Sequence, residues 1–262
     1  MANNKVRFLI EGVLDNAEMS VSSQTSGLPA INVQDELVRK VYRSTGKSNE
    51  YLQFKASGGP TGFNTVFIGN FSASRSSTIS LQLNSTGNFG SGPAVNVTLA
   101  MATDGQGNTL RKITHFFDSV QRYQHLRLYW KDAGNASSNI EVGRIMVGRY
   151  IEPNRNLRDG FGLTTYDPSR FAMTAGRQGY ANVKRHYTEM TYAVSSLDEA
   201  EQDQILGIYA KVGRFAPLLV SLDPVSRPQH HTFYSQITTN LGRQQRFGKE
   251  MNLVELTFQE KN

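Results

Sequence analysis

Histidine and carboxylate side chains are the groups through which this chain could do acid–base or metal chemistry, because the sequence contains no cysteine. Its five histidines are His115, His125, His186 and the adjacent pair His230 and His231. Adjacent residues of a strand point to opposite faces, so this pair cannot hold one metal ion together without a turn. The other three lie within or beside expected strands, where a hydrogen-bonded structural histidine is the favoured interpretation. We therefore expect no metal site and no catalytic histidine.

Carboxylates raise a second possibility, since a glycosidase needs two of them across a cleft. The acidic residues considered are Asp35, Glu36, Asp132, Glu141 and Glu152. Nothing in their spacing predicts a cleft, and a solvated surface position is the favoured interpretation. The sequence also lacks a nucleophile elbow, a phosphate-binding P-loop, a zinc-protease motif and a dinucleotide-binding glycine motif. A glycosidase or esterase is the least supported alternative, and we expect neither catalysis nor a cofactor.

Aromatic and basic residues indicate which ligands the chain is able to contact. Trp130 and the tyrosines Tyr123, Tyr129 and Tyr150 could stack on sugar rings, although Trp130 lies on the apolar face of its strand and is expected in the core. The net charge of +6 permits an anionic partner such as DNA, lipopolysaccharide or an acidic protein. The arginines are scattered, which favours solvated or interface positions over a nucleic-acid site.

The stretch 123–156 organises the elements that must position these residues. Its first strand alternates, with Leu126, Leu128 and Trp130 on one face, and a polar loop at 131–139 leads to a second apolar strand. Gly143 interrupts that strand and predicts a bulge or a close backbone approach. Short strands separated by Gly, Ser and Asn clusters precede this hairpin, which indicates an antiparallel sandwich or jelly roll over residues 1–155.

A second pattern follows a polar stretch at 154–162, so we expect a second domain over residues 156–262. Its clearest feature is a helix over 197–212, opened by a capping box at Ser196 and followed by Gly213. Strands are expected before it, at 171–177 and 182–194, and after it, with a hairpin turning at 240–242 and a closing strand at 251–260. The sequence thus predicts a mainly β protein of two domains with one convincing helix.

Targeting signals are not evident. The amino-terminal apolar run is interrupted by Arg7 and Glu11, and no segment is long enough to span a bilayer. We expect a soluble protein made in the cytoplasm, with no membrane insertion.

The first domain is similar to the galactose-binding-like (discoidin-like) jelly roll of minor tail proteins of long-tailed bacteriophages. The residues that carry this resemblance are LPAINV at 28–33, VYRS at 41–44, VFIGNF at 66–71, LRLYW at 126–130, IEVGRI at 140–145 and IEPNRN at 151–156. The second domain resembles the β-sandwich-plus-helix ring domain of tail tubes and distal tail proteins, through the capped helix and the closing strand. In those proteins the ring domain does not come last, so the resemblance leaves open which tail-tip component this chain is.

This resemblance implies a structural virion protein at the tail tip or baseplate, made in the host bacterial cytoplasm. It would form a hexameric or trimeric ring, join the tail tube to hub proteins, and let DNA pass transiently through the lumen. The residues we expect in self-assembly are Ile205, Ile208, Tyr209, Val254, Leu256 and Phe258.

A glycan-binding module that recognises a bacterial surface is the alternative function, since jelly rolls of this kind often bind sugars with loops at one end. The candidate loops are 16–26, 57–62 and 131–139. We expect Asp132, Asn135 and Asn139 of the third loop to contact a partner protein or a host surface glycan. No sugar-binding motif is recognisable in these loops.

Overall fold

The computed structural model describes residues 5–153, 161–174, 176–193, 199–241, 243–245, 251–253 and 256–261. The chain forms two compact units, each of which is discontinuous in sequence. One, here called the sandwich unit, comprises Glu11–Ile151 and Asp223–Thr232. The other, here called the helix unit, comprises Met1–Ile10, Glu152–Leu222 and Phe233–Asn262.

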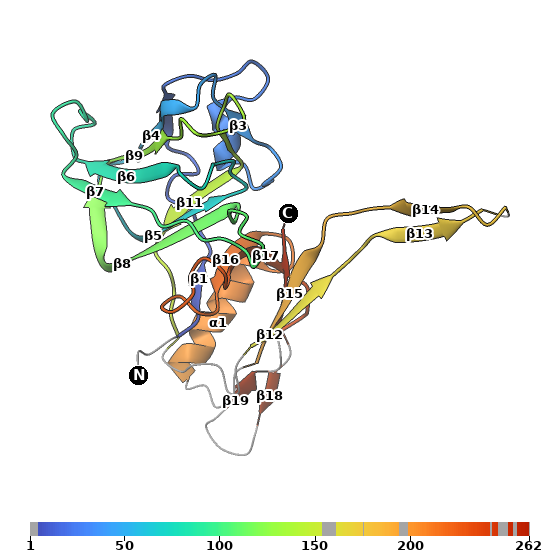
Figure 1. Cartoon of the computed structure of the whole chain (residues 1–262). Coiled ribbons are helices and arrows are strands. Elements are labelled where there is room, and N and C mark those ends of the chain that lie inside the picture. The colour runs from blue at the N-terminus through green and yellow to red at the C-terminus, as the bar shows by residue number, and fades with distance from the viewer. Residues whose placement is uncertain are drawn as a thin grey trace. The chain divides into compact units, whose positions relative to one another are not determined.

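The sandwich unit contains two main antiparallel sheets, formed by the blue to green part of the ribbon in Figure 1. In spatial order, the five-stranded sheet contains β2 (Glu18–Val21), β4 (Ser48–Lys55), β9 (His125–Lys131), β6 (Thr78–Asn84) and β7 (Val95–Thr98). The three-stranded sheet contains β11 (Arg144–Gly148), β5 (Thr61–Gly69) and β8 (Lys112–Tyr123). Two further strands, β3 (Tyr42–Arg43) and β10 (Glu141–Val142), pair beside a short 3₁₀ helix, η1 (Ala30–Gln34).

The core of this unit lies between the two sheets. In β9, Leu126, Leu128 and Trp130 are buried and the intervening side chains are not, which confirms the predicted face of that strand. Residues of β5 and β11 complete the same hydrophobic cluster from the other sheet. Gly143 lies between β10 and β11. A Cβ at this position would lie 2.2 Å from the Val38 carbonyl oxygen, so the close backbone approach expected from sequence is present.

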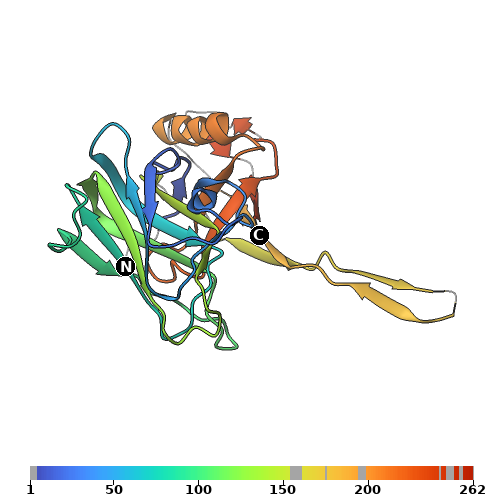
Figure 2. The ribbon, with the colours of Figure 1, turned by 90° about the horizontal axis from the view of Figure 1, so that it is seen from above.

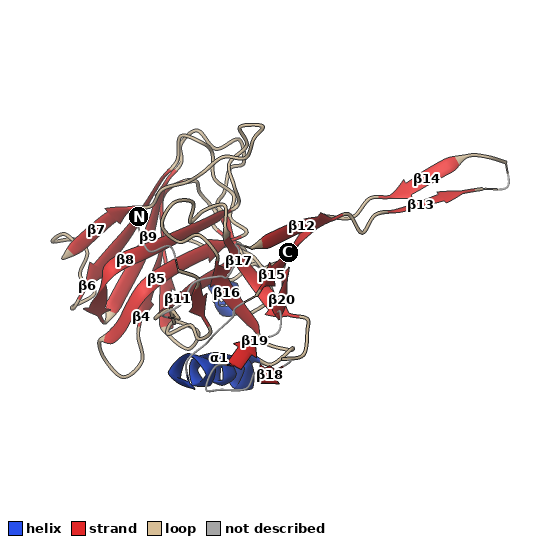
Figure 3. Ribbon diagram, turned by 90° about the horizontal axis from the view of Figure 1, so that it is seen from below, coloured by secondary structure: helices blue, strands red, loops and turns tan. Residues whose placement is uncertain are grey.

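The helix unit contains a six-stranded sheet and one α-helix. In spatial order, the sheet contains β1 (Arg7–Leu9), β16 (Pro217–Ser221), β17 (Thr232–Ile237), β20 (Leu256–Glu260), β15 (Tyr187–Tyr192) and β12 (Gly162–Tyr166). The helix, α1 (Glu199–Val212), covers one face of the sheet (Figures 2 and 3). Gly213 follows α1 at a φ of +52°, and its N–H donates to the Tyr209 carbonyl at 2.7 Å, as expected for a glycine that ends a helix. The expected mainly β fold with one helix is confirmed.

The predicted self-assembly residues contribute to the interior of the helix unit. Ile205, Ile208, Leu256 and Phe258 are all buried within the single chain, and Phe258 lies beside the ring of Phe8 from β1. Tyr209 is half-buried, and Val254 lies outside the described residues. The four buried side chains therefore stabilise the unit itself, which leaves contacts with another copy to other surfaces.

A long hairpin projects from the sheet of the helix unit (Figures 1 and 2). Beyond β12 and β15 the chain continues into β13 (Arg170–Met173) and β14 (Gly179–Asn182), which pair with each other and with no other described strand. At the base of this hairpin the rings of Tyr166 and Tyr187 stack, with their centroids 5.5 Å apart. We call residues 167–186 the arm.

Three elements differ from expectation because pairing partners come from distant parts of the chain. The first strand, expected in the amino-terminal jelly roll, is β1 and pairs antiparallel with β16 in the helix unit. Among the described residues, the strands expected to form a hairpin turning at 240–242 pair with other strands: β18 (Arg243–Gln245) pairs with β19 (Met251–Leu253), and β17 pairs with β20. The expected linker at 154–162 lies largely outside the described residues, and its last residue begins β12.

Candidate functional site

The loop at 131–139 is held in place by the buried carboxylate of Asp132. This side chain has an exposed fraction of 0% and accepts hydrogen bonds from the Ser74 backbone N–H at 2.8 Å and from the Ser74 hydroxyl. It also accepts one from Asn135 Nδ2 at 3.0 Å, while its own N–H donates to the Lys47 carbonyl at 3.1 Å. A carboxylate with several donors is well compensated for its burial. Asp132 thus joins the loop to the segment that begins at Ser74.

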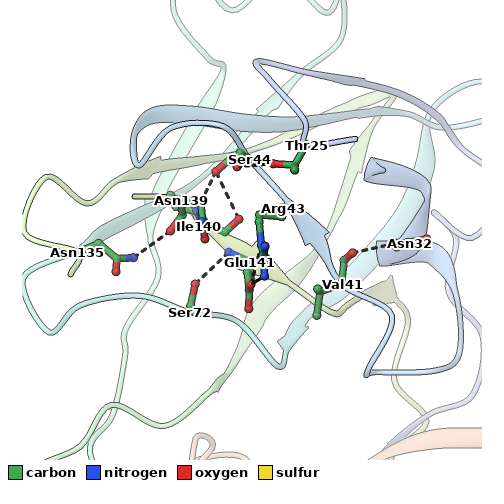
Figure 4. A network of polar contacts seen from close by, with 10 residues as sticks. All are labelled: Thr25, Asn32, Val41, Arg43, Ser44, Ser72, Asn135, Asn139, Ile140 and Glu141. Atoms are coloured by element: carbon green, nitrogen blue, oxygen red, sulfur yellow. Dashed lines mark hydrogen bonds and ion pairs between the residues drawn. The ribbon is translucent and has the colours of Figure 1, made fainter. Parts of the chain in front are cut away.

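Asn135 continues the same network (Figure 4). It is buried; its Nδ2 also reaches the Asn139 carbonyl at 3.4 Å, and its Oδ1 accepts from the Ser137 N–H at 3.0 Å. Lys47 Nζ donates to the Asn135 carbonyl at 2.8 Å. Asp132 and Asn135 are therefore occupied in holding the loop, and partner or glycan contacts predicted for it would come from its other atoms.

Beyond the loop, residues 140 and 141 are fixed from two sides (Figure 4). The Ile140 N–H donates to the buried Ser44 hydroxyl at 2.8 Å, and the Glu141 N–H donates to the Ser72 hydroxyl at 3.0 Å. Glu141 also pairs with the Arg43 guanidinium at 2.5 Å. The carboxylate of Glu141, considered above as a catalytic candidate, is thus one half of an ion pair between β10 and β3.

A pocket of about 360 Å³ lies against this rigid loop. Three segments line it, 71–74, 109–111 and 134–136, so the loop predicted from sequence contributes one wall. Phe71, Ala73 and Leu110 supply apolar surface, and the exposed Arg111 donates from Nε to the Phe71 carbonyl at 3.3 Å. No carboxylate or imidazole is among the described residues that line this first pocket.

A second pocket, of about 570 Å³, shares Thr109 with the first. Arg75, Ser77 and His230 are among its polar lining residues, and Leu99 and Met101 supply apolar surface. His230 comes from the segment Asp223–Thr232, far along the chain from the others. Because these residues are distant in sequence, pattern analysis missed this pocket, and no local signal marks Arg75, Ser77, Thr109 or Arg111 as site residues.

Gln229 attaches the segment Asp223–Thr232 to the sandwich unit. Its buried carboxamide accepts from the Thr114 N–H and donates to the Thr114 carbonyl, both at 2.7 Å, as a neighbouring strand would. Lys112 Nζ donates to the Thr232 carbonyl at 2.7 Å. His230 is therefore carried by a segment with two firm anchors on β8.

The histidines occupy separate environments. Half-buried His115 lies edge-on to Phe117, with ring centroids 4.6 Å apart, and its burial lowers its pKa below the usual value. Burial likewise lowers the pKa of His125 and of His231, whose Nδ1 is 3.5 Å from Asp223 Oδ2. Exposed His186 lies 3.3 Å from Asp167. Across the described part of the chain, no three His, Asp or Glu side chains are grouped as metal ligands would be.

The aromatic candidates divide between core and surface. Trp130 is buried in the core, as expected. On the outer face of the five-stranded sheet, the Arg127 guanidinium lies over the rings of Phe89, Tyr51 and Tyr129 at 4.4, 5.7 and 5.5 Å. The Tyr129 hydroxyl also donates a hydrogen bond to Asn49 Oδ1 at 2.7 Å. These contacts within the protein explain why aromatic and basic side chains lie together on this face.

Comparisons with known proteins give structural neighbours only, since no family model and no curated protein matches the sequence. The lectin domain of lectinolysin, complexed with Lewis b antigen, is 15% identical with a TM-score of 0.41 and covers 53% of this chain and 96% of its own. The family 32 carbohydrate-binding module of Clostridium perfringens NanJ, complexed with galactose, is 15% identical with a TM-score of 0.39. The match covers 53% of this chain and 98% of that module. A fucose-binding module of Streptococcus pneumoniae is 9% identical with a TM-score of 0.40. The match covers 53% of this chain and 96% of that module.

These neighbours are carbohydrate-binding modules with the galactose-binding-like fold, and their similarity is too low to carry a conclusion about a ligand. The expected relationship to phage tail-tip proteins has no support among them and stays a prediction. Within the described residues, no helix combines the length and apolar character that crossing a membrane requires.

We predict that Asp132→Ala destabilises the sandwich unit by ~2–3 kcal/mol, because the donors of Ser74 and Asn135 lose their buried acceptor. The measurement is chemical denaturation followed by the fluorescence of Trp130, the single tryptophan, which lies in this unit. Ser138→Ala, at an exposed position of the same loop, is the matched control and should be neutral. Equal stability of the two variants would contradict the assigned role of Asp132.

Acidification should also destabilise the sandwich unit through His115. In the unfolded chain a histidine takes up a proton as the pH falls through about 6.5, whereas buried His115 stays neutral to a lower pH, so proton uptake favours unfolding below that value. Denaturation at pH 7.5 and pH 5.5 should show a smaller loss of stability in His115→Gln than in the wild type. A loss of stability that is unchanged in His115→Gln would remove this explanation.

Proposed function

We propose that the sandwich unit is a non-catalytic glycan-binding module that holds a saccharide in the first pocket. The observation that carries the proposal is the rigid loop wall of that pocket, in which apolar and hydrogen-bonding groups lie side by side. A pyranose ring has an apolar face and a hydroxylated edge, so it needs such a mixed surface. Low reorganisation on binding favours affinity when the walls are already held by internal hydrogen bonds.

Individual side chains suit the two parts of a sugar. Phe71, Ala73 and Leu110 offer apolar surface, and the Arg111 guanidinium, oriented by its bond to the Phe71 carbonyl, offers donors to hydroxyl oxygens. The described residues that line the pocket include no acid–base pair, so binding without bond cleavage is the chemistry they support. Galactose and fucose, named for two of the structural neighbours, are suitable first probes.

We predict that Arg111→Ala weakens binding of the best glycan found on an array by about tenfold, since charged hydrogen bonds are lost. Isothermal titration calorimetry measures the change. Arg122→Ala removes an exposed arginine near the end of β8 and should leave affinity unchanged. If the wild type binds no glycan, or if Arg111→Ala binds as the wild type does, glycan binding at this pocket is rejected.

We also propose a second function, assembly of the helix unit into a larger structure, for which the arm is the supporting observation. Phe171, Met173, Tyr180 and Val183 on the arm are between 60% and 79% exposed. The register pairs Phe171 with Ala181 and Met173 with Gly179, so one face of the β13–β14 pair carries apolar residues and glycine. A two-stranded hairpin with an uncovered apolar face is marginally stable in water, and a partner would cover it.

The assembly proposed is the ring of a phage tail tip that connects the tail tube to hub proteins and carries receptor-binding parts in the virion. Its supports are the resemblance found in the sequence and the uncovered arm. With the sandwich unit binding a surface glycan, one chain would join a host-recognition module to a structural platform. The two functions are separable because they depend on different units.

We predict that the wild type forms trimers or hexamers in light-scattering measurements as its concentration rises, because burying the apolar face of the arm favours association. Phe171→Ser combined with Met173→Ser should shift the mass toward the monomer. Tyr180→Ser, on the opposite face of the hairpin, is the control and should associate more than the double variant. A wild type that stays monomeric at every concentration would count against self-assembly through the arm.

A further inference from the structure

The second pocket has a chemistry distinct from that of the first. It is larger, and its charged and titratable lining residues among those described are Arg75 and His230, with no carboxylate. Arg75 is exposed and forms no hydrogen bond or ion pair with any described residue. An arginine that is not neutralised by a neighbour presents its planar set of donors to whatever enters the pocket.

Ser77 adds a buried donor to the same lining. Its exposed fraction is 9%, and its hydroxyl has no hydrogen-bond partner among the described residues. Buried hydroxyls are usually hydrogen-bonded, and a serine side chain reorients by rotation about one bond. A ligand that brings acceptor oxygens into the pocket would supply the missing partner.

The position of His230 is set by the anchors of its segment. Gln229, its neighbour, is attached to both backbone groups of Thr114, and Thr232 is attached to Lys112. The imidazole of His230 is exposed at the pocket and has no hydrogen-bond partner within the described chain. The pocket thus gathers a guanidinium, an imidazole and a hydroxyl from segments that are far apart in sequence.

We propose that the second pocket is a subsite for the anionic group of an acidic saccharide, a carboxylate or a sulfate ester, whose sugar ring lies beside Thr109, the residue that lines both pockets. This inference rests on the proposed glycan binding. Arg75 pairs with the oxyanion, Ser77 and His230 donate to its oxygens, and Leu99 and Met101 contact the ring carbons. Because Thr109 lines both pockets, a sugar ring beside it that contacts the first pocket can direct its carbon 6 substituent into the second. The basic character of the chain, with a net charge of +6, favours the approach of such a ligand.

The test compares ligands that differ in one group. Galactose, galacturonic acid and galactose 6-sulfate share a ring and differ at carbon 6, so the neutral sugar is the reference and the two acids separate carboxylate from sulfate. Titration calorimetry on the full chain should show at least one acid bound about tenfold more tightly than galactose at low salt. That preference should shrink as salt rises.

Matched variants assign the preference to the pocket. Arg75→Gln should abolish the preference for the acid while leaving galactose affinity unchanged, and Ser77→Ala and His230→Gln should each reduce it. Arg122→Gln removes the same charge at an exposed position that lines neither pocket and should keep the preference. Because Arg75 is exposed, its substitution should leave the fold intact, which thermal denaturation verifies.

Two negative results are distinguishable. If galactose binds and neither acid binds more tightly, the acidic subsite is overturned while glycan binding stands. If no sugar binds, glycan binding fails, and inorganic sulfate then tests the pocket alone by chemical-shift titration of the His230 imidazole. A sulfate-dependent shift that is lost in Arg75→Gln would support the anion subsite. The absence of any shift in the wild type would overturn it.

Discussion

The buried carboxylate of Asp132 is the interaction on which the loop end of the sandwich unit depends. It accepts hydrogen bonds from the backbone N–H and the hydroxyl of Ser74 and from the side chain of Asn135. It therefore joins the loop at 131–139 to the loop that contains Ser74. Those loops supply part of the lining of both pockets, because Ser74 and Asn135 line the first while Arg75 and Ser77 line the second. A buried acceptor with several donors is therefore the means by which polar loops acquire a defined surface.

A second constraint acts from a distant part of the chain. Gln229 satisfies both backbone groups of Thr114 with one carboxamide, which lets an irregular segment lie against β8 as a strand would. Exposed backbone groups at this position would otherwise need water or another strand. The consequence is functional as well as structural, since the same segment brings His230 to the second pocket. The second proposed subsite thus depends on the Gln229 anchor as well as on Asp132.

The helix unit combines a sheet whose strands β16 and β17 are buried with a hairpin whose apolar side chains are exposed. Residues expected to meet another copy, such as Ile205 and Phe258, are instead buried in the unit, because an amphipathic helix beside a sheet first covers the sheet of its own chain. No described element covers the arm in this way, and its exposed Phe171 and Met173 are part of the apolar surface to which the proposal assigns a partner. The proposed combination of a glycan-binding module with an assembling unit would account for both features.

Local patterns were sufficient for the class of the fold and for several of its elements. The alternation of β9, the helix that ends before Gly213 and the close approach at Gly143 depend on neighbouring residues, so they were readable from sequence. The pairing of β1 with β16 and the joining of Arg75, Ser77 and His230 in one pocket depend on residues far apart in the chain. Periodicity reports which face of an element is apolar and not which element will cover it. The sequence by itself determined a mainly β chain with one polar loop of interest, and only the tertiary structure decided which side chains that loop uses internally and which others form the site.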